Sequence, residues 1–199
     1  MALGDPYATL SELKQQMGIE AGDEYDDDRL TRALLAATRE IETWCRRQFN
    51  RADTATPRLY TPRNARCVRV DDFWTTDDLQ VATGPGYGTV WASSDYRVEP
   101  LGGIVDGQPG WPYSRIVGVG RTFAAGCGPT LQVTARWGWG EVPEPVRDAC
   151  LILAAESFKL GDAPFGVAGF GDYGPVRLRM NSVVQTKLAP YRRDPVLVA

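Results

Sequence analysis

The chain has 199 residues, of which 43% are hydrophobic and 24% charged, the composition of an ordinary globular protein. Its 22 basic and 25 acidic residues give a net charge of -3. This balance argues against general affinity for nucleic acid, which needs a basic surface that releases counterions from phosphates. Histidine is absent, which excludes Ser-His-Asp and Cys-His catalysis and His-ligated metals. We therefore expect a protein that is not an enzyme and that holds no cofactor or metal.

The spacing of the cysteines and the lengths of the apolar runs indicate the cellular compartment of the protein. The four cysteines, which are far apart and include no C-x-x-C pair, are Cys45, Cys67, Cys127 and Cys150. This spacing favours buried free thiols over a disulfide framework or a zinc site. No apolar run is long enough to span a membrane, and Met1–Pro6 lacks the basic and apolar regions of a signal peptide. We expect the protein to be made and kept in a cytoplasm.

Two helices are predicted near the N-terminus. Thr9 and Glu12 have the spacing of a capping box, so a short helix should run to about Met17 and end at Gly18. A longer helix is predicted over residues 28–49, because apolar residues recur there every three or four positions. These residues, which form one apolar face, are Leu30, Leu34, Ala37, Ile41, Trp44, Cys45 and Phe49.

Acidic residues precede this helix, and arginines form a stripe along it. The acidic run before it consists of Asp23, Glu24, Asp26, Asp27 and Asp28. It fits solvated residues at a helix start, and also the lining of a passage that must not hold DNA. The arginines that recur every seven residues along the helix are Arg32, Arg39 and Arg46. This stripe is interpreted as a solvated helix face or as a set of partners for acids of another subunit.

From residue 57 to residue 137 the helical pattern gives way to short β segments separated by Gly, Pro and Asp. Candidate strands cover residues 58–60, 67–70, 79–82, 89–91, 96–99, 115–119 and 131–137. They predict a small antiparallel sheet or barrel between two helical segments. In the loop from Gly102 to Tyr113, Trp111 is either an anchor for a partner or a staple over the sheet.

A central helix is predicted over residues 144–160, with Pro145 in its first turn and Lys159 in its last. Its middle, residues 149–155, is apolar on every side but too short to cross a bilayer. Protein must therefore cover it on more than one face. The cover comes from the rest of the chain and possibly from a neighbouring subunit.

The segment after this helix, residues 162–174, is rich in Gly and aromatic residues. It leaves a helix instead of a strand, and no Gly-Lys-Ser/Thr follows, so it fits neither a dinucleotide-binding loop nor a P-loop. Its composition favours an arm that docks on another surface, with a loop folded over its own core as the alternative. The candidate docking residues are Phe165, Val167, Phe170 and Tyr173.

The C-terminal part is predicted to hold a strand over residues 176–180 and a short helix, capped by Asn181 or Ser182, that reaches about Leu188. After it, the prolines at positions 190 and 195 predict an extended basic tail with an apolar end. The apolar end favours a tail held by a partner over a disordered one. The candidate interface residues of the tail are Pro190, Tyr191, Arg192, Arg193, Val196 and Leu197.

These elements predict an α+β fold: a helical core with long helices at 28–49 and 144–160, an inserted small antiparallel β subdomain and an extended C-terminal tail. We divide the chain into an N-terminal helical segment (residues 1–53), the β-rich insert (54–140) and a last part (141–199). The last part holds the central helix, the Gly-rich loop and the C-terminal arm. Together the three parts form one domain.

The order of these segments resembles that of phage head-to-tail connector proteins, the adaptors that sit under the portal of tailed phages. The stretches that carry the resemblance are Tyr7–Leu13, the acidic break, Leu30–Glu42, Val142–Cys150 and Leu188–Arg193. Asp95–Pro100 and Asp162–Gly174 are similar to the longer adaptors of phages that infect actinobacteria. The sheet is longer than in the smallest adaptors, so the contacts of this insert do not carry over.

The resemblance implies a virion structural protein that forms a twelve-fold ring in the neck, between the portal and a head-completion or tail-terminator protein. Such a ring extends the DNA channel, offers a platform for the next ring and catalyses no reaction. Double-stranded DNA would pass through it without sequence-specific binding. The resemblance also implies assembly in the host cytoplasm, with no membrane partner.

Three alternatives stay open. A stopper or tail-terminator protein, one ring lower, would be richer in β structure and would lack the two long helices. A carboxylate-based glycan hydrolase could use Asp71, Asp72, Asp77 or Asp78 beside Trp74, because paired acids can do acid–base work. A small-molecule or sugar-binding module would rest on the six tryptophans, which are equally common in cores and at interfaces.

Overall fold

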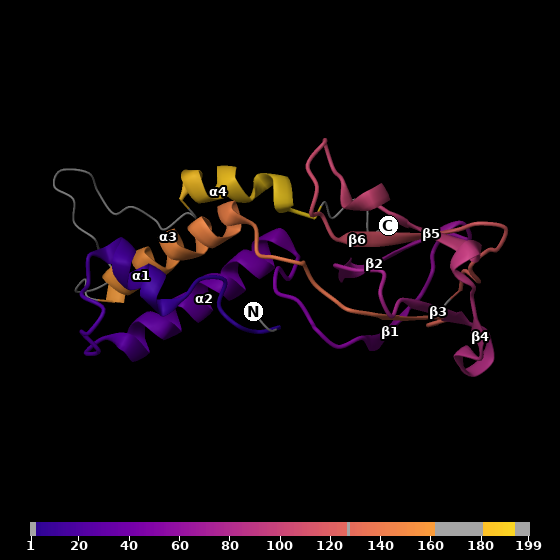
Figure 1. Cartoon of the computed structure of the whole chain (residues 1–199), viewed down its shortest axis with the longest axis horizontal. Coiled ribbons are helices and arrows are strands. Elements are labelled where there is room, and N and C mark those ends of the chain that lie inside the picture. The colour runs from indigo at the N-terminus through magenta and orange to yellow at the C-terminus, as the bar shows by residue number, and fades with distance from the viewer. Residues whose placement is uncertain (1–2, 127, 162–180, 194–199) are drawn as a thin grey trace. The chain divides into compact units, whose positions relative to one another are not determined.

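The structure, a computed structural model, describes residues 3–126, 128–161 and 181–193. The chain folds into two compact units (Figure 1). Residues 3–47 and the described part of 142–193 form a helical unit, and residues 48–141 form a β unit. The predicted α+β fold class is therefore confirmed. The predicted strand at 176–180 lies outside the described residues.

The first helix, α1 (Leu10–Met17), is confirmed with its predicted caps. The Thr9 hydroxyl accepts a hydrogen bond from Glu12 N at 3.2 Å, and the Glu12 carboxylate accepts one from Thr9 N at 2.7 Å. These bonds, the backbone one foremost, lower the pKa of Glu12 because they favour its charged form. At the other end Gly18 adopts a φ of 71°, and its N–H donates to Gln15 O.

The second helix, α2 (Asp27–Cys45), ends four residues earlier than predicted. Arg46 adopts a left-handed φ of 54°, which breaks the helix. Phe49 fits the helical spacing but belongs to the β unit, where its ring packs on Trp139 with centroids 5.1 Å apart. At 19 residues α2 is the longest described helix, and the long helical core that the sequence predicted is not evident.

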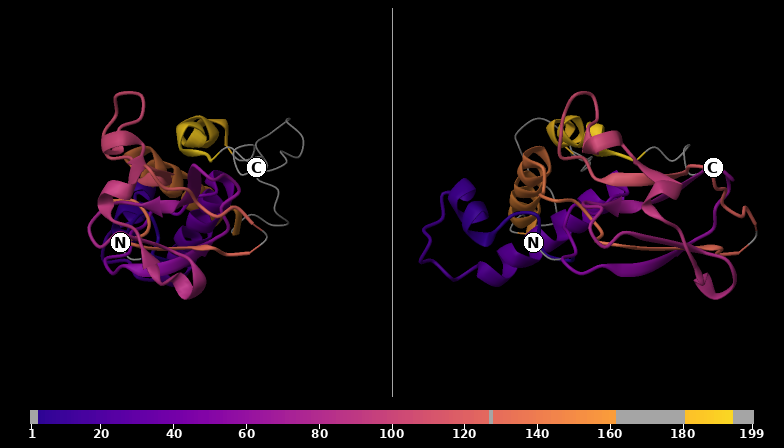
Figure 2. Two further views of the ribbon diagram at one scale, coloured as in Figure 1. Left: turned by 90° about the vertical axis from the view of Figure 1, so that its right-hand side faces the viewer. Right: turned by 45° about the vertical axis from the view of Figure 1, so that its right-hand side comes forward.

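The third helix, α3 (Glu144–Gly161), lies between the other helices of its unit (Figures 1 and 2). It contacts α1, α2 and α4 (Ser182–Leu188). Its buried residues are Val146, Ala149, Cys150, Leu153 and Ala154. The cover predicted for this apolar helix thus comes, on these faces, from the chain itself.

The C-terminal segment differs from the prediction. Asn181 caps α4 as expected, since its side chain accepts a hydrogen bond from Val183 N at 2.9 Å. The chain then forms a 3-10 turn, Ala189–Tyr191, where an extended tail was predicted. Pro190 is tolerated because the first turn of a helix needs no bond from its nitrogen.

The β unit contains seven strands among its described residues, one for each predicted segment; the ends agree for residues 96–99 and are shifted in the other six. They are β1 (Thr56–Tyr60), β2 (Cys67–Phe73), β3 (Gln80–Thr83), β4 (Thr89–Val90), β5 (Tyr96–Glu99), β6 (Tyr113–Gly118) and β7 (Leu131–Ala135). They form two antiparallel sheets, of order β1-β7-β3-β4 and β2-β6-β5. The alternation that predicted β7 is confirmed, because Leu131, Val133 and Ala135 are fully buried.

Backbone hydrogen bonds join the first and last segments of the β unit. Ala52 N donates to Trp137 O at 2.7 Å, and Trp139 N donates to Asn50 O at 3.2 Å. Between these bonds lies Gly138, with a φ of 99°. A Cβ at this position would collide with the backbone of Asn50. The approach of the two chain segments therefore requires glycine.

We expect Gly138→Ala to lower the free energy of unfolding by about 3 kcal/mol or more, because it adds a backbone collision to an unfavourable φ. Gly140→Ala is the matched control: its Cβ would have no atom within 4 Å, and we expect a change within about 0.5 kcal/mol. Denaturant unfolding followed by tryptophan fluorescence measures both. Equal stabilities of the two variants would contradict the close approach.

Candidate interaction surfaces

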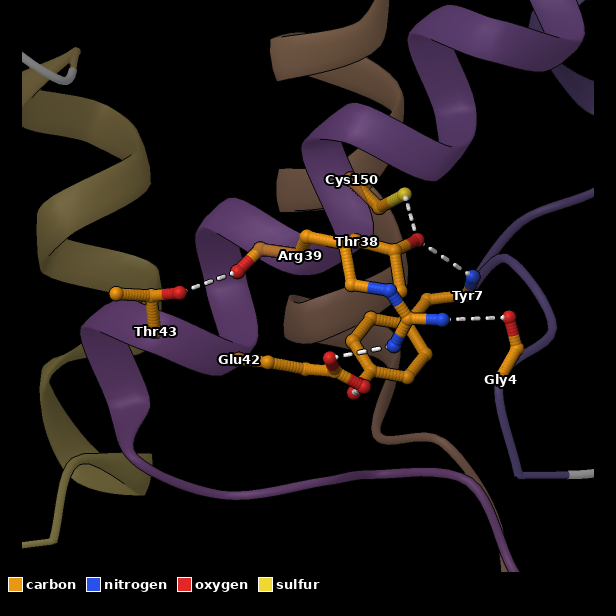
Figure 3. A network of polar contacts seen from close by, with 7 residues as sticks. All are labelled: Gly4, Tyr7, Thr38, Arg39, Glu42, Thr43 and Cys150. Carbon is orange, nitrogen blue, oxygen red and sulfur yellow. Dashed lines mark hydrogen bonds and ion pairs between the residues drawn. The ribbon is translucent and has the colours of Figure 1, made fainter.

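The N-terminal segment is tied to α2 and α3 by a buried polar network (Figure 3). Tyr7 is fully buried, and its N–H donates to the Thr38 hydroxyl at 3.1 Å. The same hydroxyl lies 3.5 Å from the Cys150 thiol. The Tyr7 O–H donates to the Glu42 carboxylate at 3.0 Å. Cys150 is fully buried, and this burial raises the pKa of its thiol, which disfavours the reactive thiolate.

Arg39, one of the three stripe arginines, belongs to this network. Its guanidinium donates to Glu42 Oε2 at 2.6 Å and to Gly4 O at 2.9 Å, and the carboxylate raises its pKa. Arg32 donates to Asp28 O at 3.2 Å, within its own helix. Arg46 lies beyond the end of α2. The three arginines thus have different surroundings, and their pairing with another subunit stays a prediction.

The described tail residues close the end of α2. Arg193 N donates to Cys45 O at 2.9 Å, which satisfies one of the terminal carbonyls of the helix. The Arg192 guanidinium lies 5.1 Å from the centre of the Trp44 ring. Burial raises the pKa of the Cys45 thiol to about 12. Local sequence patterns do not reveal this role, because the two contacting segments are far apart along the chain.

The remaining interface candidates lie outside the described residues. In the Gly-rich segment these are Phe165, Val167, Phe170 and Tyr173, and in the tail Val196 and Leu197. Pro190 and Tyr191 form the 3-10 turn after α4. The docking roles of all these residues stay predictions.

The Trp111 ring packs on Trp139, with ring centroids 5.2 Å apart, and the backbone N–H of Trp111 donates to Gly103 O at 3.0 Å. Both contacts lie within the β unit. Of the two interpretations of Trp111, the staple over the protein's own fold is therefore the one that the structure supports.

The acids considered for glycan hydrolysis have separate partners. Asp71 accepts hydrogen bonds from Arg58 at 2.7 Å and from the Tyr60 hydroxyl at 3.0 Å. Asp72 is buried and accepts one from Trp139 Nε1 at 3.1 Å. These two residues are consecutive in β2, so their side chains leave opposite faces of the strand.

The other two acids lie in the turn before β3. Asp78 pairs with Arg136 at 2.6 Å, and Asp77 N donates to the Thr75 hydroxyl at 3.1 Å. Trp74 donates its indole N–H to Ala52 O at 3.0 Å. The carboxylates of Asp71, Asp72 and Asp78 thus have local structural partners, and the structure gives the hydrolase alternative no support.

Part of the acidic run in the sequence surrounds Tyr25, a residue that is 91% exposed. We call residues Glu20–Asp26 the acidic loop. The nearly buried Lys14 holds this loop from inside: its Nζ donates to Asp23 O at 2.7 Å and pairs with Asp27 at 2.5 Å. Lys14 therefore ties the loop backbone to α1, while residues 20–25 of the loop are exposed.

A second such surface lies on the sheet β2-β6-β5. Arg69 of β2 stands directly opposite Arg115 of β6, which in turn stands opposite Glu99 of β5. Arg97 of β5 lies two residues from Glu99 and therefore on the same face. We call Arg69, Arg97 and Arg115 the arginine face. Val68, which precedes Arg69, and Ile116, which follows Arg115, are buried on the other side of the sheet.

Within the described ranges no group of three or more acidic or cysteine side chains is placed to hold a metal ion. The described helices are also too short or too polar to cross a membrane.

No family model and no curated protein matches this chain. Two solved structures share its fold. One is the neck of an empty GTA particle computed with C6 symmetry, with a TM-score of 0.58 and 17% identity, covering 95% of this chain and 91% of that chain. The other is the neck of a native GTA particle computed with C12 symmetry, with a TM-score of 0.55 and 16% identity, covering 96% and 91%. The likeness spans both units of the chain.

We expect Lys14→Met to lower the free energy of unfolding by about 2 kcal/mol, because it removes the charge that Asp27 and the loop carbonyls contact. Amide hydrogen exchange within the acidic loop should rise as well. Lys187→Met, which removes the more exposed pair with Asp148, is the control and should cost less than about 1 kcal/mol. Equal effects, or unchanged exchange in the loop, would contradict the anchoring role of Lys14.

Proposed function

We propose that the protein is a structural component of the neck of a phage-like particle, specifically a head-to-tail adaptor that forms a ring under the portal. The observation that carries this proposal is the fold shared with the GTA neck chains over nearly the whole length of both partners. A shared single domain would be weaker support, because one fold serves many functions. Here the helical unit and the β unit both have counterparts.

The proposed ring is twelve-fold. Support comes from the native GTA neck, which was computed with C12 symmetry. A ring needs heterologous contacts, in which one surface of a subunit meets a different surface of the next. We propose that the ring extends the portal channel and gives a head-completion or tail-terminator protein its platform. Double-stranded DNA passes without sequence-specific contacts, for which the net charge of -3 is suitable.

Within the neck, the adaptor is favoured over a stopper or tail terminator because of the helical unit. Four described helices, of which α2 and α3 have 19 and 18 residues, pack together in it. A more β-rich ring protein is the second candidate, and the seven strands of the β unit are its support.

Negative-stain electron microscopy of the protein co-expressed with the portal protein of its own genome tests the adaptor role. We expect portal rings to gain a collar only when both proteins are present, because the portal serves as the template for the ring. Each protein alone is the control. Bare portal rings in the presence of folded, concentrated protein would contradict the adaptor role and favour a lower neck ring.

We also propose that the tail from Pro190 to Val198 grips the portal. Truncation after Arg193 tests this without loss of the bond from Arg193 N to Cys45 O. We expect portal binding to be lost in co-purification while the thermal unfolding midpoint stays unchanged. Truncation before Pro190 is the comparison, and should also lower stability because it exposes the end of α2. Unchanged portal binding after the first truncation would overturn the role of the tail.

A further inference from the structure

Helix α4 lies antiparallel on α3 (Figure 1). Asn181, which caps α4, donates its side-chain amide to the Glu156 carboxylate at 2.8 Å. At the other end of α4, Lys187 pairs with Asp148 at 3.1 Å. Glu156 and Asp148 are eight residues apart, and therefore lie about two turns apart on one side of α3. Polar contacts thus fix both ends of α4 on α3.

Helix α4 depends on this support. It has seven residues, and isolated helices shorter than about 12 residues are marginal in water. Val184 and Leu188, which are four residues apart and share one face, are fully buried. The turn that follows leads to Arg193, whose N–H donates to Cys45 O at the end of α2. A helix of this kind must rest on an α3, either its own or that of another copy.

The connection between α3 and α4 is longer than this packing needs. Asn181, at the start of α4, contacts Glu156, which lies five residues before the end of α3 at Gly161. Antiparallel helices placed in this way are commonly joined by about two to eight residues. The connection here, residues 162–180, has 19 residues, and a chain of that length can span about 60 Å. Its length therefore allows α4 to reach the α3 of another copy.

We propose that α4 is exchanged between neighbouring copies, so that the α4 of each copy packs on the α3 of the next. This inference rests on the ring of the proposed function, because an exchange passed from copy to copy around a closed ring is a heterologous contact. The bonds of Asn181 and Lys187 form again in the exchanged state. The long connection weakens the preference of α4 for its own α3, since the effective concentration of a tethered segment falls with tether length.

The alternative is that α4 stays on its own copy and that the connection serves only as the docking arm. Every contact that distinguishes the two states lies within the helical unit. Cross-linking of α3 to α4 is therefore a direct test.

The first experiment places two thiols where Asp148 and Lys187 touch. In protein whose Cys67 and Cys127 are replaced by Ser, Asp148→Cys and Lys187→Cys are joined by a short bismaleimide. Without exchange the product runs as a monomer on a denaturing gel. Exchange around a ring gives a ladder of covalent multimers instead, and this ladder is the result that we expect in portal collars. A monomeric product in the collars would overturn the proposal.

The matched control is Ser182→Cys with Thr186→Cys in the same background. These two exposed residues lie four apart on α4, so a link between them stays within one copy in either state. Multimers formed by the control measure random collision between copies. We expect the pair at positions 148 and 187 to give about tenfold more multimers than the control, and equal yields would overturn the proposal.

A second experiment separates the two thiols. Asp148→Cys protein is co-expressed with a tagged Lys187→Cys protein of different size, both in the same Ser background. Only exchange brings the two thiols together, because neither copy carries both. We expect a covalent pair of the two proteins, at about ten times the yield from a mixture of Ser182→Cys and Thr186→Cys proteins. Absence of this pair in collars that contain both proteins would overturn the exchange.

The outcome is distinguishable from that of the portal experiment. A collar that gives only the monomeric product overturns the exchange of α4 and leaves the adaptor role intact. A ladder in concentrated protein that forms no portal collar contradicts the adaptor role alone. Protein that gives neither a collar nor a ladder overturns both.

Discussion

The close approach of residues 48–52 and 137–140 is the constraint on which the arrangement of the chain depends. The chain leaves the helical unit after Arg47 and returns to it at Val142, so the β unit must begin and end at one place. Backbone bonds from Ala52 to Trp137 and from Trp139 to Asn50 bring its two ends together. Gly138 makes this possible because no side chain fits between the segments.

The helical unit depends on the same return of the chain. Thr38 of α2 and Cys150 of α3 meet in the buried network although 112 positions separate them. The carbonyl of Cys45, at the end of α2, accepts a hydrogen bond from the backbone N–H of Arg193, which lies still further along the chain. Helix α2 precedes the β unit in the sequence, and α3 and Arg193 follow it. The helical unit is therefore built from two distant parts of the chain that stabilise each other.

Local patterns predicted the parts of the fold that depend on near neighbours. The capping box at Thr9 and the alternation of β7 could be recognised because their partners lie within a few residues. The end of α2 could not, since Phe49 continues the helical spacing but packs on Trp139. For the candidate sites the limit is the same: the contact of Arg39 with Gly4 and that of Arg193 with Cys45 join distant residues.

The acidic run shows why a surface function needs the structure as well as the sequence. In the sequence its carboxylates are equivalent, and a solvated helix start explains them all. In the structure the buried Lys14 pairs with Asp27 and donates to a loop carbonyl, and Arg29 pairs with Asp26. Tyr25 and the acids that precede it are exposed. The buried ammonium group of Lys14 adds no apolar contact to the hydrophobic core; it bonds the exposed loop. Its hydrogen bond to the loop backbone reduces the conformational entropy that the loop would lose in any binding event.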